Sequence, residues 1–200
     1  MGDRGDGVVI IFGEDAMPEC GRPYTANVVA HCFLGMASAA RVNICHMKLQ
    51  KLVYFAHGWC LALTGSPLIE ESVEAWKYGP VISSIYYRFE EFGNTPIDRV
   101  RLAPEAAREV NTIIRKDDST TALLQRIWEV YGDFNAIELS KMTHLPGTPW
   151  LQVREGEQTE KANITIPDEL IKQYFREFVK PAPTALTLYH RYWRGLMRCQ

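Results

Sequence analysis

The sequence has no long apolar run, no excess of charge of one sign and no paired cysteine motif. No apolar stretch reaches the roughly 18 residues of a membrane-spanning helix, which excludes that class of protein. The 22 Lys and Arg residues against 24 Asp and Glu residues leave a net charge of −2, which argues against a strongly electrostatic nucleic-acid binder. Five cysteines without a CxxC pair, and no secretory leader, predict reduced thiols and a cytoplasmic protein.

Catalytic and cofactor motifs of fixed spacing are missing as well. The chain has no GxSxG, HExxH, P-loop or GxGxxG pattern. His57 and Cys60 lie three residues apart on one predicted helix, whereas nucleophilic pairs normally come from different elements around a cleft. The neighbouring His and Cys residues lack the usual spacing of zinc ligands. We therefore expect no enzyme, no metal and no cofactor.

What the sequence does contain is helical periodicity. The clearest helix covers residues 46–64, where apolar side chains form a continuous stripe that predicts a central position in the core. Gly58 lies inside this helix at a cost of about 1 kcal/mol relative to alanine, which indicates close packing against another backbone. Residues 73–78 are predicted to be extended before the turn at Gly79 and Pro80. The predicted fold is mainly α, a compact single helical domain with a minor short β element.

The chain divides into three segments. Residues 1–16 contain an apolar, strand-like run but precede a second methionine, so they are either an N-terminal strand or a leader from a start site assigned too early. Residues 25–179 form the predicted helical domain. Residues 180–200 follow as a basic, amphipathic tail helix, in which Trp193 lies on the apolar face. This tail docks on the domain, on a second copy or on a partner.

Aromatic side chains outside the apolar stripes are the candidate interaction residues. Trp76, Tyr78 and Trp150 stand beside Gly-Pro and Pro-Trp turns. Trp, Tyr and Arg dominate binding hot spots, which favours an interaction surface over purely structural positions that fix turns. A second grouping, Lys48 and Lys51 with Tyr54, has the basic and aromatic character of a nucleic-acid site. The balanced charge makes protein docking the favoured interpretation.

Three sequence blocks resemble one known family. They are KLQKLVYFAHGWCLALTGSPL from residue 48, EAWKYGPVISSIYYRFEEFG from residue 74 and IWEVYGDFNAIELSKMTHLPGTPW from residue 127. Their order and spacing are similar to those of the Panacea domain, the GepA or SocA-like antitoxin family of bacteria, prophages and mobile elements. We expect the three blocks to build one site, in which Trp76, Tyr78 and the turn at Gly79 and Pro80 pack near the 46–64 helix and Trp150. The candidate partner-binding or domain-signature residues are Lys48, Lys51, Tyr54, His57, Trp76, Tyr78, Gly79, Pro80, Thr143, His144, Pro149, Trp150 and, in the tail, Trp193.

The resemblance implies a small helical antitoxin of a toxin-antitoxin system. Such a protein binds a cognate toxin encoded by an adjacent gene, and it needs no cofactor, membrane or nucleic acid. A homodimer is compatible with the sequence. Two other functions remain as alternatives: a DNA-binding regulator of its own operon, and an enzyme that depends on histidine or cysteine.

Overall fold

The structure is a computed structural model that describes residues 11–12, 23–97, 104–156 and 164–181. Within these ranges the chain is mainly helical and carries one small three-stranded sheet, which confirms the predicted fold class. The helices are α1 (Ala26–Ala40), α2 (His46–Thr64), α3 (Ser83–Phe89), the short 3-10 helix η1 (Glu90–Phe92), α4 (Pro104–Lys116), α5 (Asp118–Tyr131), α6 (Ala136–Met142), α7 (Pro149–Gly156) and α8 (Asp168–Arg176). The strands are β1 (Ile11–Phe12), β2 (Val73–Trp76), β3 (Gly79–Val81), β4 (Ile164–Ile166) and β5 (Lys180–Pro181).

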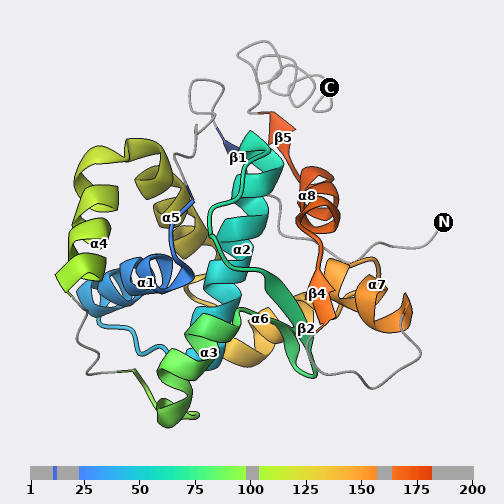
Figure 1. Cartoon of the computed structure of the whole chain (residues 1–200), viewed down its shortest axis with the longest axis horizontal. Coiled ribbons are helices and arrows are strands. Elements are labelled where there is room, and N and C mark those ends of the chain that lie inside the picture. Colours follow the sequence, from blue (N-terminus) through green and yellow to red (C-terminus); the bar gives the residue numbers. More distant parts are fainter. Residues whose placement is uncertain (1–10, 13–22, 98–103, 157–163, 182–200) are drawn as a thin grey trace, which may run out of the picture.

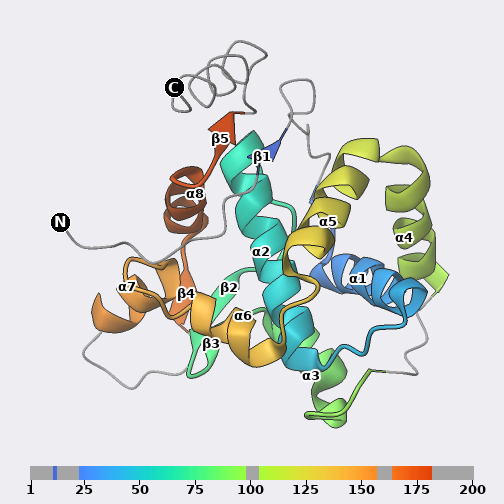
Figure 2. The ribbon, with the colours of Figure 1, turned by 180° about the vertical axis from the view of Figure 1, so that it is seen from behind.

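Helix α2 is the centre of the fold. It runs through the middle of the molecule, with α1, α4 and α5 on one side and α7, α8 and the small sheet on the other (Figures 1 and 2). Every residue from Lys48 to Leu63 is buried, as expected for a helix enclosed on all sides. A β-carbon on Gly58 would overlap the Phe175 ring of α8, so the packing at this glycine is close, but the neighbour is a side chain and not the predicted backbone.

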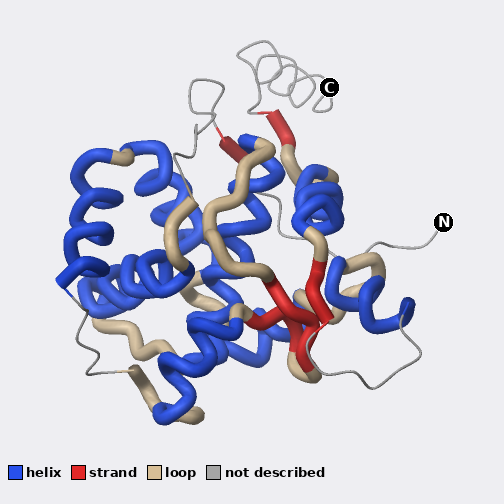
Figure 3. Tube along the Cα trace, viewed as in Figure 1, coloured by secondary structure: helices blue, strands red, loops and turns tan. Residues whose placement is uncertain are grey.

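The strands occur in two places (Figure 3). β2 is the middle strand of the antiparallel sheet, whose order is β3-β2-β4. In the β2–β3 hairpin Trp76 faces Gly79, which leaves Lys77 and Tyr78 as the turn. At the other place β1 pairs in parallel with β5, with Ile11 opposite Lys180. Two residues of the 1–16 segment are therefore paired with the chain that follows α8.

Local capping explains where several helices begin and end. Helix α6 begins with a capping box, because Asn135 Oδ1 accepts from the Glu138 amide (3.0 Å) and Glu138 Oε2 accepts from the Asn135 amide (2.7 Å). Asp117 caps α5, and its carboxylate accepts from the Thr120 amide (2.8 Å), so the helix begins at Asp118.

The described residues include the start of the predicted tail. In the predicted tail, Lys180 and Pro181 form β5, while residues 182–200, with Trp193, lie outside the described residues. Across the described ranges, none of the helices has the length and apolar character that a membrane crossing requires.

Candidate functional site

Helix α2 carries Lys51 into the interior, where its ammonium group meets the turn of the β2–β3 hairpin. Nζ donates hydrogen bonds to the carbonyl oxygens of Tyr78 (3.1 Å) and Pro80 (2.9 Å). Lys51 is 1% exposed, and this burial lowers its pKa to about 7 because the charged form loses its hydration. The buried Lys51 amino group therefore fixes the two carbonyl groups that flank Gly79.

Gly79 is required in this turn for two separate reasons. Its φ of +105° lies in the region that only glycine adopts without strain. A β-carbon at this position would also lie 2.6 Å from Lys51 Nζ and 2.7 Å from Thr143 Oγ1. The glycine thus supplies both the turn geometry and the space into which the lysine and the threonine reach.

The C-terminal end of α6 closes the other side of the turn. Ser140 Oγ donates to the Tyr78 carbonyl (3.2 Å), the same oxygen that Lys51 holds. The Ser140 carbonyl in turn accepts from Thr143 Oγ1 (2.7 Å) and from His144 Nδ1 (2.6 Å). Since a carbonyl oxygen only accepts, this contact places a proton on Nδ1 of His144.

Trp150 connects α7 to the same hairpin. Its indole Nε1 donates to the Trp76 carbonyl (2.7 Å), and its ring lies 4.0 Å from that of His144 between centroids. The preceding Pro149 is buried at the first position of α7, where a missing amide proton is tolerated. The three sequence blocks therefore converge on one turn, as the sequence predicted.

Above this support, the turn presents an aromatic side chain to solvent. Tyr78 is 67% exposed, and Lys77 Nζ lies 5.3 Å from the centre of its ring. Trp76 is half-buried and packs against Tyr86 of α3, with 4.8 Å between ring centroids. We define the Tyr78 turn as residues 77–79 together with the groups of Lys51 and Ser140 that hold it.

Other predicted site residues lie elsewhere in the interior. Lys48 donates from Nζ to the Gly132 carbonyl after α5, and Tyr54 is buried among aromatic rings beside Phe175. His57 Nε2 lies 3.2 Å from Asp168 Oδ1 at the start of α8. The three side chains hold α2 to its neighbours and do not join the Tyr78 turn.

The alternative chemistries find little support. Cys60 Sγ donates to the Ser66 carbonyl (3.4 Å), whereas His57 is engaged with Asp168, so the two do not form a nucleophilic pair. Among the described residues no group of three His, Cys, Asp or Glu side chains is arranged to hold a metal ion. The proposed nucleic-acid grouping of Lys48, Lys51 and Tyr54 is wrong as a surface, because all three are buried.

Sequence reasoning missed Gln50 as part of this support. Gln50 Oε1 accepts from the Ile82 amide (2.9 Å), and its Nε2 donates to the Ile82 carbonyl (3.0 Å), so one side chain pairs with the backbone where β3 ends. A polar residue between Lys48 and Lys51, next to the predicted core stripe, was the available signal. It did not reveal which backbone segment the amide would meet.

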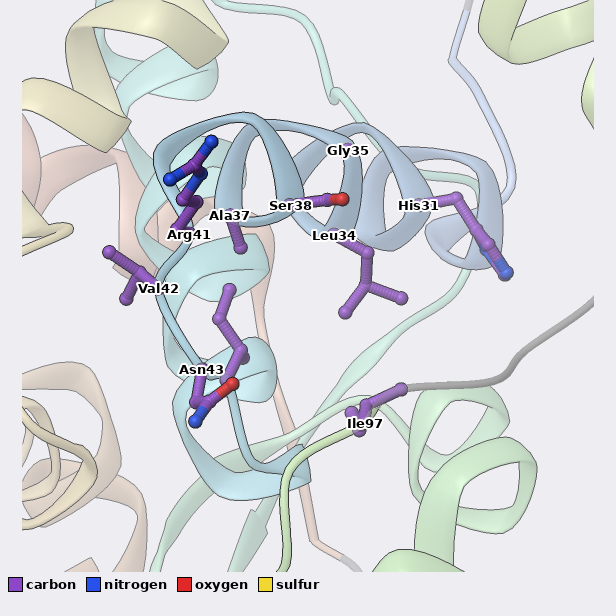
Figure 4. A pocket seen from close by; sticks show the side chains of 10 residues that line it. His31, Leu34, Gly35, Ala37, Ser38, Arg41, Val42, Asn43 and Ile97 are labelled. Carbon is purple, nitrogen blue, oxygen red and sulfur yellow. The ribbon is translucent and has the colours of Figure 1, made fainter.

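A separate groove runs along α1 (Figure 4). It encloses about 570 Å³, and residues from α1, from the connection to α2 and from the segment before residue 98 line it. Leu34 points into it, and Arg41 lies at one end (Figure 4). It shares no lining residue with the Tyr78 turn.

Comparison with known proteins agrees with the resemblance of the three blocks. The family model "Antitoxin SocA-like, Panacea domain" matches residues 49–151, which include all parts of the Tyr78 turn. Antitoxin SocA of Caulobacter vibrioides (strain NA1000 / CB15N) is 32% identical over 154 residues, which cover 76% of this chain and 82% of that protein. No solved structure matches significantly. The chain therefore belongs to the SocA-like antitoxin family that shares the Panacea domain.

Proposed function

We propose that this chain is an antitoxin that neutralises a cognate toxin protein, encoded by an adjacent gene, by binding it directly. The observation that carries the proposal is the similarity to Antitoxin SocA across 76% of the chain. In this proposal residues 25–179 are the toxin-binding domain, and the tail from residue 180 is an appendage that contributes Trp193 to the same partner.

The surface chemistry supports binding as the mode of action. Tyr78 is 67% exposed, and tyrosine is enriched among the residues that dominate binding energies. Nanomolar affinity corresponds to about −12 kcal/mol, which a standard-sized interface with a few aromatic anchors reaches. Of the candidate partner-binding residues, Trp76, Tyr78 and His144 are the ones with solvent-accessible surface in and around the turn.

The interior chemistry supports a function without catalysis. Burial raises the pKa of the Cys32 thiol to about 12, so this cysteine is an unreactive thiol at neutral pH. Cys60, the candidate nucleophile of the sequence, has no exposed surface. Both side chains serve the core in this proposal.

Expression in bacteria tests the proposal. The protein of the adjacent gene is expressed alone, with the full chain, and with the Tyr78→Ala variant, and growth and co-purification are measured. We expect growth arrest by that protein alone, rescue by the full chain and recovery of a complex of the two. If growth is fully rescued but no complex of the two proteins can be co-purified, direct binding is contradicted.

A further inference from the structure

The Tyr78 turn joins an outward aromatic side chain to an inward polar support. Tyr78 is 67% exposed, whereas Lys51 directly beneath its carbonyl is 1% exposed. Tyr87 offers a comparison within the same molecule, because it is 63% exposed but lies in the regular helix α3. The two tyrosines thus differ in their support and hardly in their exposure.

The support is costly for what it adds to stability. A buried ammonium loses its hydration, and the partners of Lys51 are neutral carbonyl groups rather than a carboxylate. The two hydrogen bonds offset only part of this desolvation cost. What the ammonium does achieve is to fix the two carbonyl oxygens on either side of Gly79. Ser140 adds a second bond to one of them.

A fixed turn is useful to a binding surface. Ordering a loop and its side chains on association lowers affinity, and a turn that is already ordered avoids this loss. Helix α6 passes beside the hairpin (Figure 2). Lys141 of this helix is exposed and follows Ser140, which touches the turn. Lys77 is also exposed, and its Nζ lies 5.3 Å from the centre of the Tyr78 ring, so a positive charge accompanies the ring. Glu138 and Glu74 are held by hydrogen bonds within the domain, where Glu138 Oε2 accepts from the Asn135 amide (2.7 Å) and Glu74 Oε2 accepts from Trp76 Nε1 (2.7 Å).

We propose that the Tyr78 turn is the toxin contact and inserts the Tyr78 ring into an apolar pocket of the toxin that is rimmed by carboxylates. In this proposal Lys51 is the positioning residue that holds the turn in its bound conformation. This inference rests on the proposed antitoxin function. Lys77 and Lys141 supply the positive charges that such a rim attracts. The apolar pocket binds the Tyr78 ring, and the carboxylates of the rim orient the turn through its lysines.

Two matched pairs of variants test the contact and its support. Affinity for the adjacent-gene toxin is measured with full-length Tyr78→Ala against Tyr87→Ala, and with Lys51→Met against Lys48→Met, together with the melting temperature of each. We expect Tyr78→Ala to weaken binding about thirty-fold or more, as for a hot spot, at an unchanged melting temperature. Tyr87→Ala and Lys48→Met should bind as the unmodified chain does.

A double-mutant cycle separates positioning from general stability. If Lys51 acts through Tyr78, Lys51→Met weakens binding about ten-fold alone but adds nothing to Tyr78→Ala. Ser140→Ala should also weaken binding alone, by less than Lys51→Met, and should add nothing to Tyr78→Ala. This variant still tests the positioning of the turn if Lys51→Met does not fold. The expected rim predicts that affinity falls as salt is added and that Lys77→Glu weakens binding further.

Several results would overturn the inference. Unchanged affinity of Tyr78→Ala, or an equal loss for Tyr87→Ala, would show that the fixed turn is not the contact. Losses from Lys51→Met and Ser140→Ala that persist in full in the Tyr78→Ala background would remove their positioning role, and affinity independent of salt would remove the acidic rim. A toxin that the unmodified chain does not bind would instead contradict the proposed function itself.

Discussion

Raising the pH from 7.0 to 8.5 is expected to stabilise this protein, and Lys51 is the reason. Burial lowers the pKa of Lys51 from 10.5 to about 7 in the folded state. At pH values between about 7 and 10.5, Lys51 therefore binds up to one more proton in the unfolded chain than in the folded chain. Stability rises with pH wherever the unfolded state binds more protons, so the cost of burying the ammonium is fully present below pH 7 and is relieved above it.

The size of the effect follows from the same two values. Integration of the proton difference from pH 7.0 to 8.5 gives a gain of about 1–2 kcal/mol in the free energy of unfolding. Cys32 opposes it, because a pKa raised to about 12 in the folded state leaves only the unfolded thiol to ionise. That opposing contribution is much smaller at pH 8.5, because the unfolded thiol is then still mostly protonated. Above pH 9.5 the raised pKa of Tyr131 also opposes the trend, so the window ends below that pH.

Urea denaturation at four pH values between 7.0 and 8.5 measures the gain directly. The variant Lys51→Met is the control, because it keeps an unbranched side chain, one atom shorter, and removes the titrating group. We expect the free energy of unfolding to rise by about 1–2 kcal/mol in the unmodified protein and to stay nearly flat in the variant. Parallel curves for the two proteins would refute the reasoning, since they would mean that the folded state does not disfavour the ammonium.

Three further predictions concern the backbone. Gly79→Val should lower stability by about 1–3 kcal/mol in urea denaturation, through strain at its positive φ, and an unchanged midpoint would contradict this. Gly58→Ala should also cost about 1–3 kcal/mol, because its β-carbon meets the Phe175 ring, whereas Gly35→Ala in open space on α1 should stabilise by up to about 1 kcal/mol; equal effects of the two would contradict the packing argument. Removal of residues 1–16 deletes only the two-residue strand β1 from the described fold, so we expect a melting temperature within a few degrees of the full chain. A much lower one would identify this segment as an essential strand.

Helix α2 illustrates what the sequence determines by itself. Its bounds were predicted as 46–64, and its burial and its close packing at Gly58 followed from apolar spacing and a costly glycine. These features depend on residues that are neighbours along one helix. The positions of Trp76, Gly79 and Trp150 around one turn also followed, because the three blocks were expected to build one site.

The inward direction of the polar side chains of α2 was not predictable in the same way. A lysine beside a tyrosine has the character of a charged surface, and only a distant hairpin that supplies carbonyl groups makes burial of Lys51 tolerable. Gln50 and Lys48 follow the same rule, since their partners are the backbone of Ile82 and Gly132. Contacts between side chains and backbone far apart in sequence leave no periodic signal, so they appear only in the folded structure.

Titration of the purified full-length chain into the purified toxin of the adjacent gene tests the central claim most directly. Calorimetry of the complex is combined with an assay of toxin activity at each point of the titration. Direct binding predicts saturation at a fixed molar ratio, a dissociation constant in the nanomolar range and loss of toxin activity in proportion to the complex formed. Complete loss of toxin activity at a small fraction of that ratio, or loss of activity without measurable binding, would contradict the account.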